Sequence, residues 1–429
     1  MGAVGCCVGV AVYGCGGGGG GGAAGGSSRP PVAANPTCTQ AITRVAPYKE
    51  QMPGGGAPGV IVPATSIERA SDVGKRVHTN HLILAKSVNS FQSGNNGYTP
   101  TQIDEAYNLP IPNTTGAGAI AIVDAYNYPN ALSDFNTFST TYSLPTERSS
   151  TATGSSNTVF RVVYATGSVP PNDGGWSQEM AIDIEWAHAM APNAKIYLVE
   201  SASDSLPDII SAVNVAKTLP GVREVSTSFG GTETGCTYVD FNDAFLQNGV
   251  AFFAAAGDVA GQRNFPALSM NTVAVGGTTL SLGPLGTYLS ESVWSQTGCG
   301  PSAYEPRPVY QDNLYSTVGK YRAGCDIAAV ADPNTGVAVY DSYSYQGMSG
   351  WFIAGGTSVA CPIVAGIANG SGVVFNSSQG FNAATYALSG SAYFHQITTG
   401  SSAGYNGASP WCFPTGLGTP NGLGAMLGG

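Results

Sequence analysis

The sequence predicts an α/β protein with a mostly parallel central sheet and helices on both faces. From residue 97 onward, short apolar segments of β-prone residues alternate with helical segments. The apolar segments show no alternation of polar and apolar residues, which is typical of strands buried on both faces of a parallel sheet. We therefore expect one domain over residues 96–429.

The expected elements follow one another as strand and helix along this domain. The strands are Ala119–Val123, Phe160–Tyr164, Lys195–Val199, Val225–Phe229, Val250–Ala255 and Thr272–Val275. The helices are Ser177–Met190, Pro207–Leu219 and Asp240–Gln247. Residues 37–95 have weaker patterning and form a short pre-region.

The composition excludes one class of partner. Sixteen Lys and Arg against 26 Asp and Glu give a net charge of −10, and only 10% of residues are charged. Such an acidic surface repels nucleic acid, so no nucleic-acid partner is expected. A surface that is polar but uncharged suits a protein at low pH, because protonation of its few carboxylates builds up little positive charge.

The first residues of the chain predict export. Residues 1–15 form an apolar leader that is too short to span a bilayer and fits the core of a signal peptide. Val12–Cys15 resembles the cleavage box of bacterial lipoproteins, although no Lys or Arg precedes it. Residues 16–36 are a Gly/Ala/Ser/Pro linker. We expect a secreted or cell-surface protein, with a lipid anchor at Cys15 as one mode of attachment.

The nine cysteines show no metal-binding spacing. There is no C-x-x-C pair and no Cys/His ligand pattern, so a zinc site is not expected. Cys299 and Cys325 flank a loop rich in Pro and Tyr. We expect a disulfide between them, with free buried thiols as the alternative.

A serine stands at the start of an apolar helical segment. Ser358 follows two glycines in Gly355–Pro362, just before the apolar Ile363–Ala368. Glycines let the backbone approach closely, and a helix N-terminus has free N–H donors for an oxyanion. Ser358 is therefore a candidate nucleophile. The alternative is that it only caps the helix.

A serine nucleophile needs a neighbouring base, and a pair of carboxylates offers one. Glu179 and Asp183 are four residues apart in an otherwise apolar helical segment. On a helix this spacing puts them on one face, about 6 Å apart. Two such acids repel, so one of them holds a proton more tightly. The alternative is a solvated helix face. Of the four histidines, His188 is expected to be buried and hydrogen-bonded.

These segments resemble the sedolisin family of serine-carboxyl peptidases, which belongs to the subtilisin-like superfamily. The similar blocks, in family order over residues 97–421, are Tyr98–Ile103, Ala106–Tyr107, the helix of Glu179 with Ala187–Ala194, Ser226–Gly231, Ala255–Asp258, Val275–Thr279, Asp332–Gly336 and the Ser358 segment.

The resemblance implies a subtilisin-like fold and hydrolysis of peptide bonds at acid pH through a serine acyl-enzyme. It assigns Ser358 as nucleophile, Glu179 as general base and Asp183 as the acid that orients the base. Asp258 matches the aspartic acid of the oxyanion site, and its place after an apolar strand should raise its pKa. Asp124 stands where the family often has a further acid, or it begins a turn. The implied partners are protein or peptide substrates of a monomeric enzyme.

Three features depart from the family. Phe229 stands where a Trp is frequent, and residues 37–95 are short for the usual propeptide. At the family's calcium site, Gln396 and Cys412 replace carboxylates, and calcium prefers anionic oxygen ligands. We therefore expect no required cofactor and no metal at this position.

Two other functions stay open. One is a non-catalytic surface-binding protein that has kept the fold. The other is a Ser-His-Asp peptidase that uses Asp124, although no histidine has the His-Gly-Thr setting of subtilisins. Endopeptidase and exopeptidase action are both compatible with the sequence.

Overall fold

The computed structural model describes residues 54–55, 59–85 and 97–427. The predicted leader (1–15), with Cys15, and the predicted linker (16–36) lie outside these residues. Within the described part, no helix has both the length and the apolar character needed to cross a membrane.

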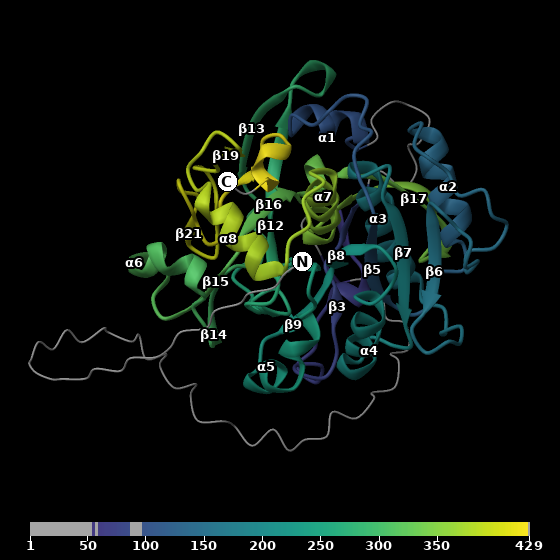
Figure 1. Ribbon diagram of the computed structural model, residues 1–429, viewed down its shortest axis with the longest axis horizontal. Helices are drawn as coiled ribbons and strands as arrows, with labels where there is room; N and C mark the ends of the chain where they lie inside the picture. Colours follow the sequence, from purple (N-terminus) through teal and green to yellow (C-terminus); the bar gives the residue numbers. More distant parts are fainter. Residues whose placement is uncertain (1–53, 56–58, 86–96, 428–429) are drawn as a thin grey trace, which may run out of the picture. The chain divides into compact units, whose positions relative to one another are not determined.

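The core of the fold is an eight-stranded sheet with the order β13-β12-β10-β8-β5-β7-β6, in which β16 also pairs with β12 (Figure 1). The strands are β5 (Ala119–Ala125), β6 (Phe160–Tyr164), β7 (Lys195–Ser201), β8 (Val222–Thr227), β10 (Ala251–Ala255), β12 (Val273–Leu282), β13 (Tyr288–Val293) and β16 (Ile327–Val330). All pairings are parallel except that of β12 with β13. Every residue of β5 and β10 is buried. The predicted parallel sheet is confirmed.

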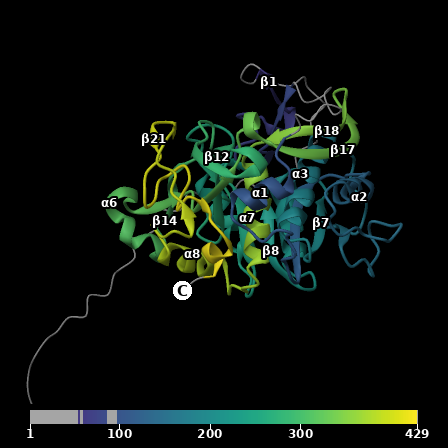
Figure 2. The ribbon, with the colours of Figure 1, turned by 90° about the horizontal axis from the view of Figure 1, so that it is seen from above.

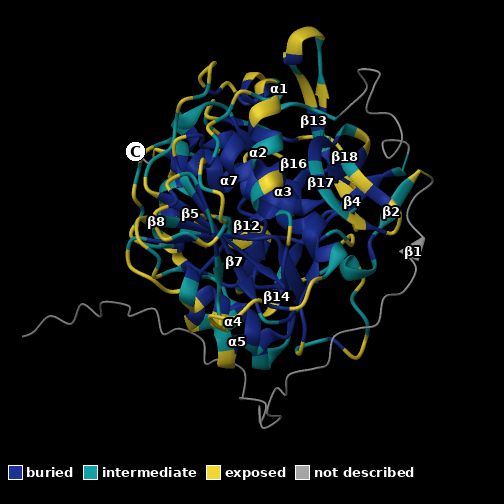
Figure 3. Ribbon diagram, turned by 90° about the vertical axis from the view of Figure 1, so that its right-hand side faces the viewer, coloured by how far each residue is buried: buried dark blue, intermediate teal, exposed yellow. Residues whose placement is uncertain are grey.

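Helices cover both faces of this sheet, as predicted. Helices α3 (Gly174–Met190) and α7 (Thr357–Gly370) pack against each other on one face, and α4 (Leu206–Ala216) lies on the other (Figure 3). Helix α2 (Ala131–Thr141) packs on α3, and α8 (Ser378–Ala387) packs on β10 and β12. Residues 175–190 of α3 are all buried, so the alternative of a solvated α3 face is wrong.

Two predicted elements differ in the structure. The expected strand at 225–229 is divided at Ser228, because β8 ends at Thr227 and β9 (Phe229–Thr232) follows. The expected helix at 240–247 is wrong. A capping box at Thr234 starts α5 (Gly235–Phe241) earlier, and the chain continues as a 3-10 turn, Asn242–Phe245.

The pre-region contributes strands to the sheets of the main domain. A five-stranded sheet has the order β1-β2-β4-β18-β17, and a smaller one has the order β11-β9-β3. Their strands are β1 (Gly54–Gly55), β2 (Val60–Val62), β3 (His78–Thr79), β4 (Leu82–Leu84), β11 (Asn264–Phe265), β17 (Val337–Tyr345) and β18 (Met348–Gly355). Figure 2 shows β1, β17 and β18 on one side of the central sheet. The weak patterning of residues 37–95 did not indicate these strands.

Short elements complete the described chain. They are α1 (Pro100–Ala106), α6 (Tyr315–Val318), β14 (Gly300–Pro306), β15 (Tyr321–Gly324), β19 (Phe394–His395), β20 (Ser401–Ser402), β21 (Tyr405–Asn406), β22 (Thr419–Pro420) and 3-10 turns at Ala64–Ser66, Pro284–Gly286, Val309–Leu314, Pro333–Thr335 and Leu423–Met426.

The predicted Cys299–Cys325 disulfide is wrong, because both thiols are free and buried. They point to different backbone carbonyls: the Cys299 Sγ contacts Ser402 O at 3.8 Å, and the Cys325 Sγ contacts Gly298 O at 3.5 Å. Cys236, in α5, is disulfide-bonded.

Candidate active site

The predicted site residues lie at the carboxyl ends of the central strands. Asp124 is near the end of β5, and Asp258 follows β10. Ser228 lies directly after β8, and α7 begins beside it. In parallel α/β sheets this edge is where ligands bind. Helix α3, packed against α7, brings Glu179 and Asp183 to the same place.

Ser358 lies in the first turn of α7 and is fully buried. Its hydroxyl donates to the Ser228 carbonyl at 3.0 Å, and its backbone N–H donates to the Asn80 carbonyl at 2.9 Å. The preceding Gly356 has φ +105°, and a Cβ there would stand 2.2 Å from the Asn80 oxygen. Only glycine permits this close approach. Gly356 therefore leaves room for the Asn80 carbonyl next to Ser358.

Glu179 and Asp183 are fully buried beside Ser358. Burial raises the pKa of Glu179 well above its usual value, while the Ser358 hydroxyl and the Asn80 backbone act in the opposite direction. Asp183 accepts a hydrogen bond from the Ser228 hydroxyl at 2.7 Å. Burial and the Glu179 charge raise the pKa of Asp183 well above its usual value. Because both pKa values are raised, the two buried acids together carry less negative charge than two solvent-exposed carboxylates would at the same pH.

Asp124 belongs to the same buried group of acids. Burial, followed by the charges of Asp183 and Glu179, raises its pKa well above the usual value. Neither of its carboxyl oxygens has a hydrogen-bond partner among the described residues. A buried carboxyl without partners is most stable in the neutral form. The role of Asp124 as an outer member of the catalytic network stays a prediction.

Asp258 is bonded to Thr357, the residue before Ser358. Its Oδ1 accepts from the Thr357 N–H at 2.7 Å and from the Thr357 hydroxyl at 2.9 Å. Its Oδ2 is buried without a partner in the described part of the chain. A Cβ placed on Gly356 would lie 2.5 Å from Asp258 Oδ2. The same Cβ would lie 2.2 Å from the Asn80 carbonyl oxygen. Asp258 Oδ2 and the Asn80 carbonyl oxygen are therefore neighbours.

Burial raises the pKa of Asp258 to about 8, although the Thr357 hydrogen bonds oppose this shift. The Glu179 charge raises the pKa further, and the His81 charge lowers it. Asp258 is therefore protonated at acid and neutral pH. With Oδ1 already accepting from Thr357, Oδ2 is the oxygen placed to donate a hydrogen bond.

The sequence analysis missed two residues of this site, Asn80 and His81. The His81 Nδ1 lies 2.5 Å from the Glu179 Oε2, and both side chains are fully buried. Burial lowers the pKa of His81 to about 4, so its ring is neutral above that pH. The contact joins residues 98 positions apart, and no local motif marks His81. By contrast, His188 is buried and bonded to the Pro145 carbonyl, as expected.

Gln396 and Cys412, the residues expected at the family's calcium site, contact protein groups. The Cys412 Sγ lies 3.0 Å from the Thr415 hydroxyl. The Gln396 amide donates to the Leu417 carbonyl at 3.3 Å and accepts from the Ser409 hydroxyl at 2.8 Å. In residues 54–55, 59–85 and 97–427 there is no group of three or more Cys, His, Asp and Glu side chains that could hold a metal.

Comparison with known proteins agrees with this fold. The subtilase family model matches residues 165–370. The structure of Pseudomonas sedolisin, a serine-carboxyl proteinase complexed with two molecules of pseudo-iodotyrostatin, superposes with a TM-score of 0.62. The alignment has 23% identity and covers 76% of this chain and 96% of that structure. The protein is thus subtilisin-like in fold.

Two curated relatives narrow the class. Sedolisin from Pseudomonas sp. (strain 101) is 25% identical over 366 residues, which cover 75% of this chain and 60% of the relative. Kumamolisin from Bacillus sp. (strain MN-32) is 30% identical over 366 residues, which cover 76% of this chain and 62% of the relative. The chain is similar to both sedolisin and kumamolisin, and it spans about 60% of the length of these relatives.

Proposed function

We propose that this protein is a secreted serine-carboxyl peptidase that hydrolyses peptide bonds at acid pH. The observation that carries the proposal is the position of Ser358 between two kinds of acid. Glu179 and Asp183 lie on its α3 side, and Asp258 lies beside the preceding Gly356. A base for the hydroxyl and a donor for the oxyanion are the two groups that acyl transfer requires.

In the proposed mechanism, Glu179 takes the proton of the Ser358 hydroxyl as that oxygen attacks the substrate carbonyl. Ser228 links Asp183 to Ser358, since its hydroxyl donates to Asp183 and its carbonyl accepts from the Ser358 hydroxyl. Burial raises the pKa of Glu179 well above its usual value. Burial therefore makes Glu179 a stronger base than a solvent-exposed carboxylate.

The oxyanion of the tetrahedral intermediate is stabilised by two donors. One is the Ser358 N–H at the start of α7, and the other is the protonated Asp258 carboxyl. When the intermediate collapses, Glu179 returns the proton to the leaving amine. Water then hydrolyses the acyl-enzyme by the reverse sequence of proton transfers. All four groups come from one chain, so a monomer is sufficient.

The direct test is the hydrolysis of denatured protein from acid to neutral pH by the wild type and by Ser358→Ala. The wild type should be active on the acid side, and the variant should not be active at any pH. Activity that is equal in both proteins would rule out the assignment.

We expect the fold to hold without calcium, because the Gln396 amide and the Cys412 thiol supply no negative charge. Addition of a chelator at the working pH should leave the thermal midpoint of unfolding within about 2 °C, since no ion-binding free energy is lost. A Cys412→Asp variant is the matched comparison. A large fall in the wild-type midpoint with chelator would show that other oxygens bind calcium.

We also expect the leader to direct export. The apolar residues 1–15 precede a Gly-rich linker, and the disulfide at Cys236 is typical of oxidising compartments. Fractionation of the native host should place the protein outside the cytoplasm, without Met1. Intact Met1 on protein in the cytoplasmic fraction would contradict this prediction.

A further inference from the structure

A second pair of buried acids lies on the central sheet. Asp124 of β5 and Glu200 of β7 stand opposite each other in the register of these neighbouring parallel strands. On the other side of β7, Tyr164 of β6 is the register partner of Glu200. Residues opposite in register point to the same face of a sheet, and adjacent strands lie about 4.8 Å apart. The carboxyl groups of Asp124 and Glu200, both fully buried, are therefore within reach of each other.

The face that the two acids share is the one covered by α3. Helix α3 packs on both β5 and β7. The charges of Asp183 and Glu179, which α3 carries, act on Asp124, and the remaining charge that acts on it is that of Glu200. Glu179, Asp183, Asp124 and Glu200 thus form an acid row, which begins beside Ser358 and continues into the sheet.

The acid row contains five carboxyl oxygens that have no hydrogen-bond partner among the described residues. They are Glu179 Oε1, Asp183 Oδ2, Asp124 Oδ1, Asp124 Oδ2 and Glu200 Oε2. The second oxygen of Glu200, Oε1, accepts from the Tyr128 N–H at 3.1 Å, which fixes the orientation of this side chain. A buried polar atom without a partner costs free energy. The oxygens of the row can satisfy one another, because a protonated carboxyl donates and an ionised one accepts.

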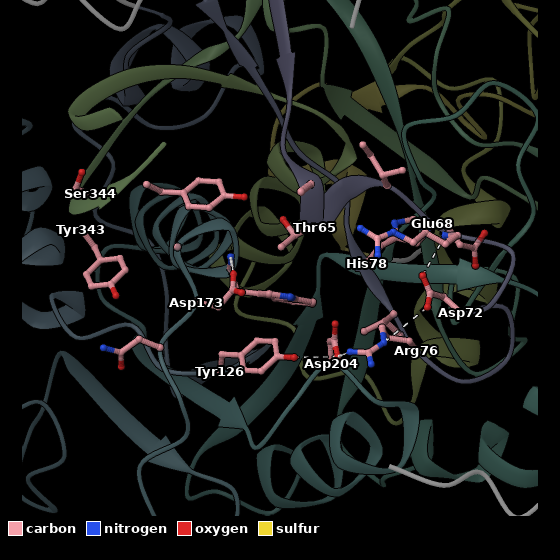
Figure 4. Close-up of a pocket in the computed structure, with 18 residues that line it drawn as sticks. Thr65, Glu68, Asp72, Arg76, His78, Tyr126, Asp173, Asp204, Tyr343 and Ser344 are labelled. Atoms are coloured by element: carbon pink, nitrogen blue, oxygen red, sulfur yellow. Dashed lines mark hydrogen bonds and ion pairs between the residues drawn. The ribbon is translucent and has the colours of Figure 1, made fainter. Parts of the chain in front are cut away.

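Protons, not cations, neutralise the inner part of the row. Within the described residues, every charge that acts on Asp124 is that of another carboxylate. A nearby acid at the same edge of the sheet is different. Figure 4 shows Asp204 in a pocket of about 380 Å³, where it pairs with Arg76 and accepts from the Tyr126 hydroxyl at 3.1 Å. The Arg76 charge lowers the pKa of Asp204 against the effect of burial, whereas Asp124 is kept neutral by a proton.

The proposed base needs help to be ionised at acid pH. Burial raises the pKa of Glu179 and opposes its ionisation. A hydrogen bond donated to a carboxylate stabilises the charged form and lowers the pKa. Asp124 retains its proton, since its pKa is well above the usual value. If that proton is directed to Asp183 Oδ2, the pair of Asp183 and Glu179 can carry a negative charge at a lower pH.

We propose that Glu200 is a positioning residue for this base: its Oε2 forms a hydrogen bond with Asp124 that directs the Asp124 proton to Asp183. The inference rests on the proposed function and adds a residue to its proton inventory. Burial raises the pKa of Glu200 to about 8, so Oε2 carries a proton at acid pH. Rotation of the two carboxyl groups closes both contacts while Tyr128 holds Oε1. Tyr164, whose pKa is raised by burial and by the Glu200 charge, stays neutral there.

The first test compares Glu200→Leu with Glu200→Gln in hydrolysis of denatured protein. Leucine has no donor for Asp124, so the acid limb of kcat/KM should move up by about one pH unit. Glutamine keeps a carbonyl for the Tyr128 N–H and supplies an N–H₂ group to Asp124. Its acid limb should coincide with that of the wild type. An acid limb that is identical in Glu200→Leu and the wild type would refute the proposal.

Glu224→Leu is the matched control. Glu224 lies on β8 of the same sheet, is 1% exposed, and has a pKa that burial raises to about 8. Its carboxyl accepts from the Asn369 amide at 2.6 Å and lies outside the acid row. Loss of this acid should lower the thermal midpoint of unfolding but leave the acid limb in place. Equal shifts of the limb in both leucine variants would show a general effect of lost buried acids and exclude a specific role of Glu200.

A second measurement does not require Glu200→Leu to fold. Infrared spectra of Ser358→Ala at acid pH contain the C=O bands of protonated carboxyls, and the band of Asp124 is assigned by its loss on addition of Asp124→Asn. Addition of Glu200→Gln should remove one further band and shift the Asp124 band, because the donor to Asp124 changes from a hydroxyl to an amide. An Asp124 band at the same frequency with Glu200 and with Gln would show that the two side chains are not in contact.

The outcomes separate this inference from the proposed function. If the wild type digests denatured protein and Glu200→Leu has the same acid limb, the positioning role is wrong and the peptidase function stands. If a folded wild type digests no denatured protein at any pH, the peptidase function fails. The infrared comparison then still decides whether Glu200 contacts Asp124.

Discussion

Replacement of Ser358 by Ala, or of Glu179 by Gln, should lower kcat/KM on peptide substrates by a factor on the order of 10⁴ or more. Alanine removes the oxygen that forms the acyl-enzyme. Glutamine has nearly the shape of glutamate but cannot take a proton from Ser358. Because nucleophile and base act as one unit, the double variant should be no slower than either single variant. The measurement is single-turnover and steady-state hydrolysis of denatured protein at acid pH.

Glu185→Gln is the control for the Ser358→Ala and Glu179→Gln variants. Glu185 lies on the same helix as Glu179, is also fully buried, and accepts from the Tyr340 N–H at 3.1 Å. Burial raises its pKa well above the usual value, as it does for Glu179. We expect activity within a few-fold of the wild type. If Glu179→Gln were fully active and Ser358→Ala inactive, the general base would be a group other than Glu179. That result would favour the Ser-His-Asp alternative.

Much of the fold could be predicted because its determinants are local. Burial on both faces leaves a continuous apolar composition in β5 and β10, and the central strands were found for that reason. The predicted helix at 240–247 failed because a capping box at Thr234 begins the helix earlier. The placement of Glu179 and Asp183 on one side of α3 followed from their spacing alone.

The missed part of the site depends on contacts between distant residues. Strands β2, β3 and β4 have only two or three residues each. They exist because β9 and β18, far along the chain, pair with β3 and β4. Strands this short leave no periodicity to detect. Asn80 and His81 gain their positions only from this pairing, so the sequence could not place them beside Ser358 and Glu179.

The alkaline limb of the pH–activity profile should be set by Asp258. Its carboxyl must hold a proton to stabilise the oxyanion, and burial raises its pKa to about 8 with Asn80 and His81 beside Ser358 and Glu179. When a substrate displaces these two residues, water should enter the cleft and lower this pKa toward its ordinary value. The alkaline limb of kcat/KM should therefore lie below pH 8. On the acid side, activity should fall as Glu179, the base, gains a proton.

Asp258→Asn tests this assignment directly. The Asn oxygen can accept from the Thr357 N–H and hydroxyl as Asp258 Oδ1 does, and its amide N–H₂ replaces the protonated Oδ2. Because this donor does not titrate, the alkaline limb should shift upward or disappear, with part of the activity retained. Asp258→Ala has no donor and should lose about 10²–10³-fold in kcat. A histidine base would instead give activity that rises through about pH 6–7 in all three proteins. That profile, or an alkaline limb that is identical in Asp258→Asn and the wild type, would exclude Asp258 from the oxyanion site.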